Sequence, residues 1–206
     1  MTGTEIRIRP ATRADADVAA SLIVMTPGGL PDLVDDLVAA RRLARAAFRA
    51  AGTGFGFDRT LVAEADGSVI GQVIRFPGSE WNRATQVRTG IVLLGAAGWR
   101  FGRRVVREGI RHARASLPIA WDSLYVISLA VVPEHRGKGI GSALLRRVVE
   151  EALDARLRSV SLDVAARNER AIRLYESEGF VTIGEERAPS RHGSPNIDSV
   201  RMELAL

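Results

Sequence analysis

The stretch "PEHRGKGIGSALL", residues 133–145, decides which fold this chain can adopt. It follows a nearly continuous apolar run over residues 124–132, which is typical of a strand buried on both faces. It leads into a helical pattern that begins near Gly139. It contains three glycines, at 137, 139 and 141. The first two flank Lys138, the single lysine of a chain that has 28 arginines.

A glycine-rich turn at the start of a helix is suited to hold an anion. The first N–H groups of a helix have no partner inside it, and the helix dipole adds partial positive charge there. Glycines leave these groups open to a ligand, and Arg136 and Lys138 bring further positive charge. The stretch therefore predicts a phosphate cradle, which a diphosphate would suit best.

Two nucleotide-binding motifs compete with this interpretation. A P-loop fails, because it needs a glycine at 132 and a serine or threonine where Gly139 follows the lysine. A dinucleotide fingerprint is matched by Gly137 and Gly139, but Ser142 stands at its third glycine. Asp163 would serve as the ribose-binding acid, yet too few residues follow for the rest of such a fold. A plain connection that binds nothing needs fewer glycines and charges than this turn has.

The rest of the chain alternates between strand and helix patterns, with Asp-Gly as a hairpin signal at 66–67. The order predicts a mixed α/β (α+β) fold. Residues 77–121 are interpreted as a helical insertion, with its helical spacing in residues 98–116. Strands are expected at 6–9, 61–64, 69–76, 124–132, 159–164, 181–184 and 200–206, and the other helices at 12–25, 32–51, from near 139 to 153, and 168–178.

Composition narrows the class of protein. An apolar content of 46% is ordinary for a globular chain, and the lack of cysteine excludes disulfides and thiol nucleophiles. The longest uncharged apolar stretch, residues 90–99, is far short of the roughly 20 residues that span a bilayer. The first residues have no apolar segment of a secretory signal. We expect a soluble, cytoplasmic protein with no membrane attachment.

Two stretches resemble the GCN5-related N-acetyltransferase (GNAT) family. The family motif [QR]-x-x-G-x-[GA] is matched by residues 136–141, "RGKGIG", after the strand phrase "LAVVP". The second stretch, "LDVAARNERAIRLYESEGF", is similar to the family's next strand and helix. The resemblance covers residues 124–184. It implies one acyltransferase domain over residues 1–206, with a central, mixed, mostly antiparallel and twisted sheet of about six or seven strands flanked by helices.

The same resemblance implies acetyl-CoA as the cosubstrate, with no metal. Family members hold the diphosphate on the backbone of the turn and the pantetheine arm along the preceding strand, where the Val131 amide would polarise the thioester carbonyl. A primary amine would then attack the thioester directly in a ternary complex. The residues that the resemblance assigns to the cofactor are Leu129, Ala130, Val131, Arg136, Gly137, Lys138, Gly139, Ile140, Gly141, Ser142 and Asn168. Asn168 also fits as the N-cap of its helix.

The resemblance places Tyr175 as the general acid that protonates the departing thiolate, although packing at the helix–sheet junction would also explain it. Several groups are candidates for the general base that takes a proton from the amine. Many family members have a glutamate near the start of the central strand, where this chain has Tyr125. Asp122, in the loop before that strand, and Glu64, in the hairpin, are further candidates, whereas Asp163 is expected to be structural. A chain of water molecules is the alternative.

The partners expected are a small-molecule or peptide amine and, by resemblance alone, a second copy of the chain. Nucleic acid is disfavoured: the arginines of residues 100–114 lack interleaved aromatic residues, and no helix-turn-helix follows. We interpret that helix as a solvated face, with an acceptor-site lid or a surface for an acidic partner as alternatives. The histidines, His112, His135 and His192, show no metal-ligand spacing. A non-catalytic acyl-CoA-binding module and a dinucleotide-binding protein stay as alternative functions.

Overall fold

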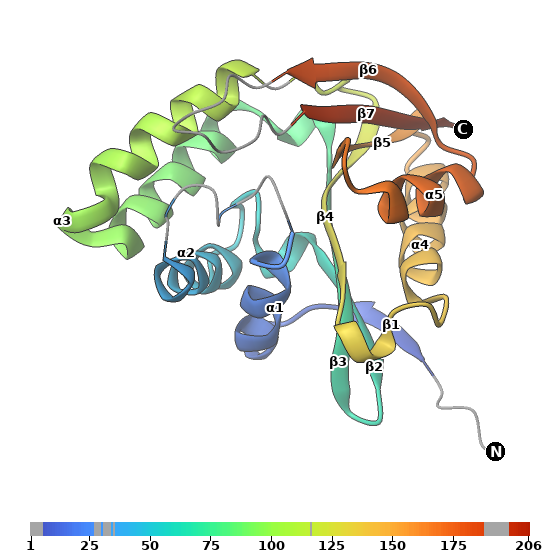
Figure 1. Cartoon of the computed structure of the whole chain (residues 1–206), viewed down its shortest axis with the longest axis horizontal. Coiled ribbons are helices and arrows are strands. Elements are labelled where there is room, and N and C mark those ends of the chain that lie inside the picture. Colours follow the sequence, from blue (N-terminus) through green and yellow to red (C-terminus); the bar gives the residue numbers. More distant parts are fainter. Residues whose placement is uncertain (1–5, 27–29, 31–33, 35, 116, 188–197) are drawn as a thin grey trace.

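A seven-stranded sheet, in the order β1-β2-β3-β4-β5-β7-β6, forms the centre of the computed structural model (Figure 1). The structure describes residues 6–26, 30, 34, 36–115, 117–187 and 198–206. All neighbouring strands are antiparallel except β4 and β5, which are parallel. The prediction of a mixed, mostly antiparallel sheet flanked by helices is confirmed.

The elements follow the predicted order. The strands are β1 (Arg7–Pro10), β2 (Thr60–Ala65), β3 (Ser68–Pro77), β4 (Ser123–Val131), β5 (Ser159–Ala165), β6 (Val181–Arg187) and β7 (Asp198–Ala205). The α-helices are α1 (Ala16–Ile23), α2 (Leu37–Arg49), α3 (Arg83–Ala115), α4 (Ile140–Asp154) and α5 (Glu169–Ser177). The β2–β3 hairpin turns at Asp66 and Gly67, both with positive φ, as the Asp-Gly signal predicts.

Two helices begin later than the sequence predicts. A short 3-10 turn, Arg13–Asp15, precedes α1, because Thr12 and Asp15 bond to each other in a capping box. The side chain of Asp36 accepts hydrogen bonds from the N–H groups of residues 38 and 39, so that α2 begins at residue 37. The predicted first turns of α2, at 32, 33 and 35, lie outside the described residues.

The helix in the insertion has 33 residues and is longer than the predicted stretch of helical spacing, residues 98–116. It begins at residue 83, so residues 90–97, which lie in the predicted helical insertion but before its helical spacing, are helical too. Gly98 interrupts it with φ 66° and ψ −178°. At that point α3 folds back, and its two arms lie next to each other in Figure 1. Leu94 and Gly102 meet across the bend, since a Cβ on Gly102 would lie 3.6 Å from the Leu94 side chain.

Helices cover the sheet on both faces (Figure 1). On one face α1 and α2 bury a cluster that includes Leu43, Phe48 and Ile74. On the other, α4 packs the apolar stripe that its sequence predicts, and Leu144 and Val148 of that stripe are fully buried against Leu162 of β5. In the described part of the chain, no helix is both long and apolar enough to cross a bilayer.

Candidate active site

The two parallel strands at the centre of the sheet separate halfway along. β4 and β5 pair only from Ser123–Ser159 to Val126–Leu162. Beyond that point β5 continues beside β7, and β4 continues beside β3 to the pair Val131–Gly71. A register shift in the β3–β4 pairing accompanies the change of direction: Ile74 and Arg75 oppose Ser128 and Val126, so that β4 carries one extra residue, Ile127. The result is a slot in the middle of the sheet.

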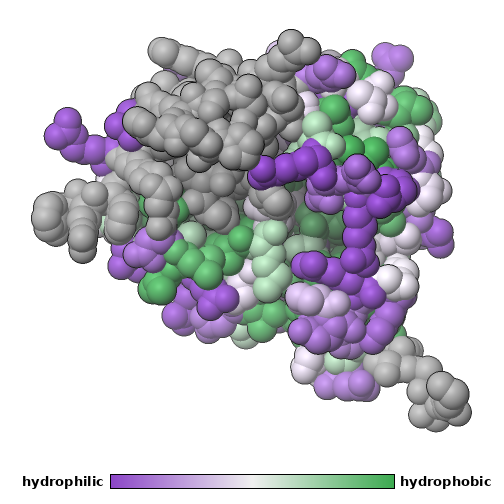
Figure 2. Space-filling model, in the orientation of Figure 1, coloured by the Kyte–Doolittle hydropathy of each residue, from purple (hydrophilic) through white to green (hydrophobic). Residues whose placement is uncertain are grey.

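A cavity of about 720 Å³ occupies the slot. In the orientation of Figure 2 it is seen as a recess with an apolar floor and a hydrophilic rim. Its lining comes from the end of α1, β4, the glycine turn, β5 and α5. The lining residues are Met25, Thr26, 126–131, His135, Arg136, Gly137, 139–142, 162–165, Arg167, Asn168, Arg170, Ala171, Leu174 and Tyr175.

The free edge of β4 presents backbone groups to this cavity. Opposed residues of an antiparallel pair alternate between bonded and non-bonded positions. The Val132 N–H donates to the Ile70 carbonyl at 2.9 Å, so the opposed pair Ala130–Gln72 is also a bonded one. Leu129 and Val131 therefore direct their N–H and C=O groups away from β3 and into the slot, whereas the backbone of Ala130 is used within the sheet.

The glycine turn closes the end of the slot. It consists of a 3-10 turn, Pro133–His135, followed by Gly137 and Gly139 with φ of 80° and 78°. The first hydrogen bond of α4 runs from the Ala143 N–H to the Gly139 carbonyl. Within the described structure, the N–H groups of residues 140–142 have no acceptor and no side chain caps the helix. A row of unpaired donors therefore faces an anion entering the slot.

The three glycines serve different purposes. Gly137 and Gly139 adopt backbone angles that side chains rarely allow, and a Cβ on Gly139 would touch nothing within 4 Å. Gly141 is needed for space, because a Cβ there would lie 3.1 Å from Leu174 of α5. Conformation explains the first two glycines, and close packing of α4 on α5 explains the third.

The polar side chains of the turn have distinct partners. The Arg136 Nε donates to the Val131 carbonyl at 2.9 Å and ties the turn to the end of β4. Lys138 is exposed and is not among the residues that line the cavity. Arg146 and, to a lesser extent, the Ser142 hydroxyl bond to Glu178, and both lower the pKa of that carboxyl group.

Asn168 and Tyr175 both reach the cavity from α5. The Asn168 Oδ1 accepts from the Ala171 N–H at 3.2 Å, which confirms its expected role as N-cap. Tyr175 is 7% exposed, and its ring centroid lies 5.9 Å from that of Phe180. Burial raises the pKa of Tyr175 to about 12. Its hydroxyl has no hydrogen-bond partner among the described residues.

Tyr125, the base candidate in the central strand, is engaged elsewhere. Its hydroxyl donates to Asp163 Oδ2 at 2.7 Å. Arg201, directly opposite Asp163 on β7 and 4% exposed, forms an ion pair with the same carboxylate. Its Nη2 lies 2.9 Å from Asp163 Oδ2. Asp163 lines the cavity with its charge compensated, which matches the structural role expected for it.

The other two base candidates are paired outside the cavity. Asp122 lies in the turn before β4, where its carbonyl accepts from the Arg158 N–H and its carboxylate faces the Arg158 guanidinium at 4.0 Å. The Glu64 carboxylate is bound by Arg9 at 2.7 Å on the β1–β2 side of the sheet. Neither is among the described lining residues. The geometry thus brings Tyr175 and the turn together and leaves Tyr125, Asp122 and Glu64 aside.

The Acetyltransferase (GNAT) family model matches residues 42–180. The chain belongs to this family. The match includes the separated strands, the glycine turn and the helix that holds Tyr175, and it ends one residue before β6.

Curated relatives of this GNAT protein are N-acetyltransferases. The [ribosomal protein bS18]-alanine N-acetyltransferase of Escherichia coli K12 is 30% identical over 105 residues, 50% of this chain and 70% of that one. The thialysine N-epsilon-acetyltransferase of Bos taurus is 36% identical over 95 residues, which cover 45% of this chain and 54% of that enzyme.

Solved structures share the fold over nearly the whole chain. An acetyltransferase crystal structure has a TM-score of 0.68 at 23% identity and covers 97% of this chain and 98% of its own. The yncA protein of Salmonella typhimurium, solved with its cofactor acetyl-CoA, has a TM-score of 0.59 at 20% identity, with coverage of 98% and 94%.

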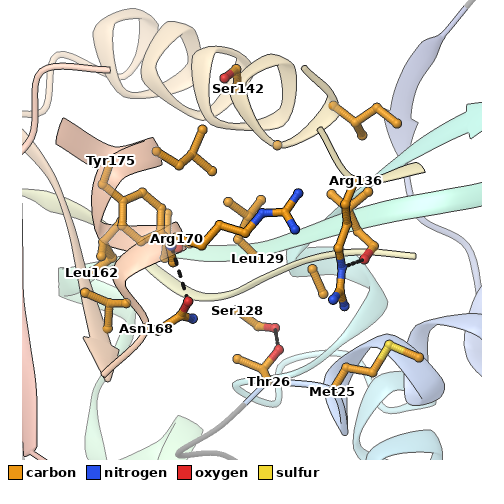
Figure 3. Close-up of a pocket in the computed structure, with 18 of the residues that line it drawn as sticks. Met25, Thr26, Ser128, Leu129, Arg136, Ser142, Leu162, Asn168, Arg170 and Tyr175 are labelled. Carbon is orange, nitrogen blue, oxygen red and sulfur yellow. Dashed lines mark hydrogen bonds between the residues drawn. The ribbon is translucent and has the colours of Figure 1, made fainter. Parts of the chain in front are cut away.

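Some residues of the GNAT cavity were not identified from the sequence. The Thr26 and Ser128 hydroxyls lie 3.0 Å apart at the α1 end of the cavity, as Figure 3 shows. Arg170 extends into the cavity from α5 in the same view. Thr26 and Ser128 are 102 positions apart in the sequence, and neither lies in a motif, so no local signal connects them.

Proposed function

We propose that this chain is an N-acetyltransferase that moves an acetyl group from acetyl-CoA to a primary amine by direct attack in a ternary complex. The observation that carries the proposal is the slot between β4 and β5. It places a row of unpaired N–H groups at one end and the free edge of β4 along its side. We propose that residues 1–206 act as one such domain, in the cytoplasm.

The residues present fit acetyl-CoA. The N–H groups of residues 140–142, beside glycines with positive φ, suit a diphosphate. The groups of Leu129 and Val131 suit the amides of a pantetheine arm, because an extended chain can pair with a free strand edge. Arg136 acts here as a tether for the turn, since its Nε is bonded to the Val131 carbonyl.

The proposed reaction forms one bond and breaks one. The amine nitrogen attacks the thioester carbonyl carbon, the C–N bond forms, and the C–S bond breaks. The Val131 N–H is the protein's donor for charge that develops on the carbonyl oxygen. Tyr175, which keeps its proton because its pKa is about 12, donates it to the sulfur of the leaving thiolate, and it regains a proton when the attacking nitrogen loses its second one.

The amine must lose a proton, since a free alkyl ammonium has a pKa of about 10. Asp163 is the single carboxylate among the described lining residues, and Arg201 and Tyr125 already bind it. We therefore propose that the amine gives its proton to solvent water. The bS18-alanine and thialysine enzymes act on a protein and a small amine respectively, and we carry over to this chain only the class of primary amines.

The compensated charge of Asp163 favours one second candidate, a module that binds acyl-CoA without catalysis. Such a module would need the same slot and turn but no base. Turnover of any amine, measured through release of free thiol, separates the enzyme from the binder.

Calorimetric titration with acetyl-CoA, with NADH and ATP in parallel, tests the proposed ligand. We expect micromolar binding of acetyl-CoA alone, abolished by Gly139→Glu, because a side chain at φ 78° strains the turn and a carboxylate there repels the diphosphate. Gly67→Glu is the matched control, since Gly67 also has positive φ and open space but lies in the β2–β3 hairpin. Failure of a folded sample to bind acetyl-CoA, or a preference for NADH, would contradict the proposal.

A further inference from the structure

Arg170 reaches over the glycine turn from the opposite side of the slot. Because Asn168 caps α5, Arg170 is the second residue of the helix and lies at the mouth of the cavity. Figure 3 shows its side chain extended from α5 across the cavity. A Cβ on Gly137 would lie 3.8 Å from Arg170 Nη2, so the guanidinium lies directly above the turn.

Two of the neighbouring arginines are paired with carboxylates, whereas Arg170 is not. Arg173, one turn further along α5, pairs with Glu169 at 3.1 Å. Arg146 of α4 pairs with Glu178 at 2.9 Å. Arg170 has no hydrogen-bond or ion-pair partner among the residues that the structure describes.

We propose that Arg170 binds the diphosphate of acetyl-CoA from the α5 side, opposite the backbone donors of the turn. A guanidinium presents a planar fork of donors that matches two phosphate oxygens, which suits it to this position. This inference rests on the proposed function and adds to it a side-chain contact from a second helix. The diphosphate would then join α4 to α5, the helix that holds Tyr175 five residues further on.

Arg170 and β4 would contact different halves of the cosubstrate. Arg170 lies above the turn, whereas Leu129 and Val131 line the slot along β4. Loss of its charge should therefore weaken the hold on the diphosphate and leave the thioester arm in place. S-Acetylpantetheine, which has the thioester and the amides but no diphosphate, distinguishes the two effects.

The experiment is calorimetry of the full chain with acetyl-CoA and with S-acetylpantetheine. For Arg170→Ala we expect the Kd of acetyl-CoA to rise about tenfold, as the loss of a charge-assisted contact would cause, and the Kd of S-acetylpantetheine to stay unchanged. Arg170→Lys should fall between wild type and Arg170→Ala, because it keeps the charge but not the fork. Arg173→Ala, on the same helix and outside the cavity lining, should bind both ligands as wild type does.

Several outcomes would overturn the assignment. An unchanged Kd for acetyl-CoA in Arg170→Ala would do so directly. An equal rise in the Kd of acetyl-CoA for Arg173→Ala would show that the effect comes from general surface charge. A rise in the Kd of S-acetylpantetheine for Arg170→Ala would show that α5 itself is disturbed. If wild type binds no acetyl-CoA, the proposed function fails instead, and this is established before any variant is compared.

Discussion

Tyr175 combines burial with access to the cavity. Its ring is packed in the α4–α5 core, yet it lines the slot, and its hydroxyl has no described partner. Burial holds its pKa at about 12, so the hydroxyl is a donor at every ordinary assay pH. Tyr125, the second tyrosine of the chain, differs because its hydroxyl already donates to Asp163. The two tyrosines therefore form a matched pair for testing the role of the hydroxyl.

Tyr175→Phe should lower kcat by about 10²-fold, the usual contribution of general acid catalysis, and leave the Kd of acetyl-CoA unchanged. In wild type the rate should rise with pH as the amine loses its proton. It should not fall again below about pH 10, because a group with a pKa of about 12 is still protonated there. The measurements are steady-state kinetics against pH and calorimetry.

Tyr125→Phe is the control, with kcat close to that of wild type. A Tyr175→Phe variant with wild-type kcat, or a fall in the wild-type rate between pH 8 and about 10, would contradict the role of Tyr175 as acid.

The α3 hairpin shows how two glycines in one helix can have opposite effects. Gly95 has ordinary helical geometry, is exposed, and has open space where a Cβ would be. Gly98 has φ 66° and ψ −178°, a region that is essentially restricted to glycine, and it is where the helix folds back. The sequence does not distinguish these two glycines, because the difference lies in their backbone angles.

Gly95→Ala should raise the free energy of unfolding by about 0.5–1 kcal/mol, since alanine restricts the unfolded chain and favours the helix. Gly98→Ala should lower it by about 1–3 kcal/mol, because the bend then requires a strained backbone. Urea unfolding monitored by circular dichroism measures both. Shifts of the same sign for the two variants would contradict the assigned bend.

At the scale of the whole molecule, the separated strands bring two distant parts of the chain to one ligand site. The turn between β4 and α4 and the first turn of α5 face each other across the slot. Both emerge from the same pair of parallel strands, so the topology fixes their distance. A ligand that contacts both elements adds a link that the chain itself does not make.

Acetyl-CoA should therefore slow amide hydrogen exchange at residues 129, 131 and 140–142. The amide of Ala130, already bonded within the sheet, should not change and serves as an internal control. At a ligand concentration of 100 times Kd, the free energy of unfolding should rise by about 2.7 kcal/mol. Residue-resolved NMR exchange tests this. Protection at residue 130 but not at 129 and 131 would contradict the register of β4.

The sequence predicts the features that depend on local periodicity or on one special turn. The buried stripe of α4, the Asp-Gly hairpin and the glycine turn are of this kind. Features that depend on pairing between distant strands were predicted incompletely or not at all. Arg201 meets Asp163 because β5 and β7 are neighbours in one register, and the unpaired groups of Leu129 follow from where β5 leaves β4. Neither relation leaves a pattern within a single segment.

The hairpin shape of α3 was missed for another reason. Its first arm, residues 83–98, mixes apolar and small residues without a clear period, and Val87 and Ile91 are exposed. A helix with apolar residues on its outer surface does not show the one-sided pattern on which sequence interpretation depends. The contact of α3 with α2, the bend at Gly98 and the approach of Leu94 to Gly102 define it.

The separation of β4 from β5 also gives the sheet an edge in its interior. Sheet edges elsewhere in proteins attract any extended chain, including those of unwanted partners. Here the edge lines a cavity of about 720 Å³, beside the glycine turn before α4 and the first turn of α5. A linear molecule with amide groups that enters this cavity can pair with β4, whereas the outer strands of the sheet, β1 and β6, do not line it.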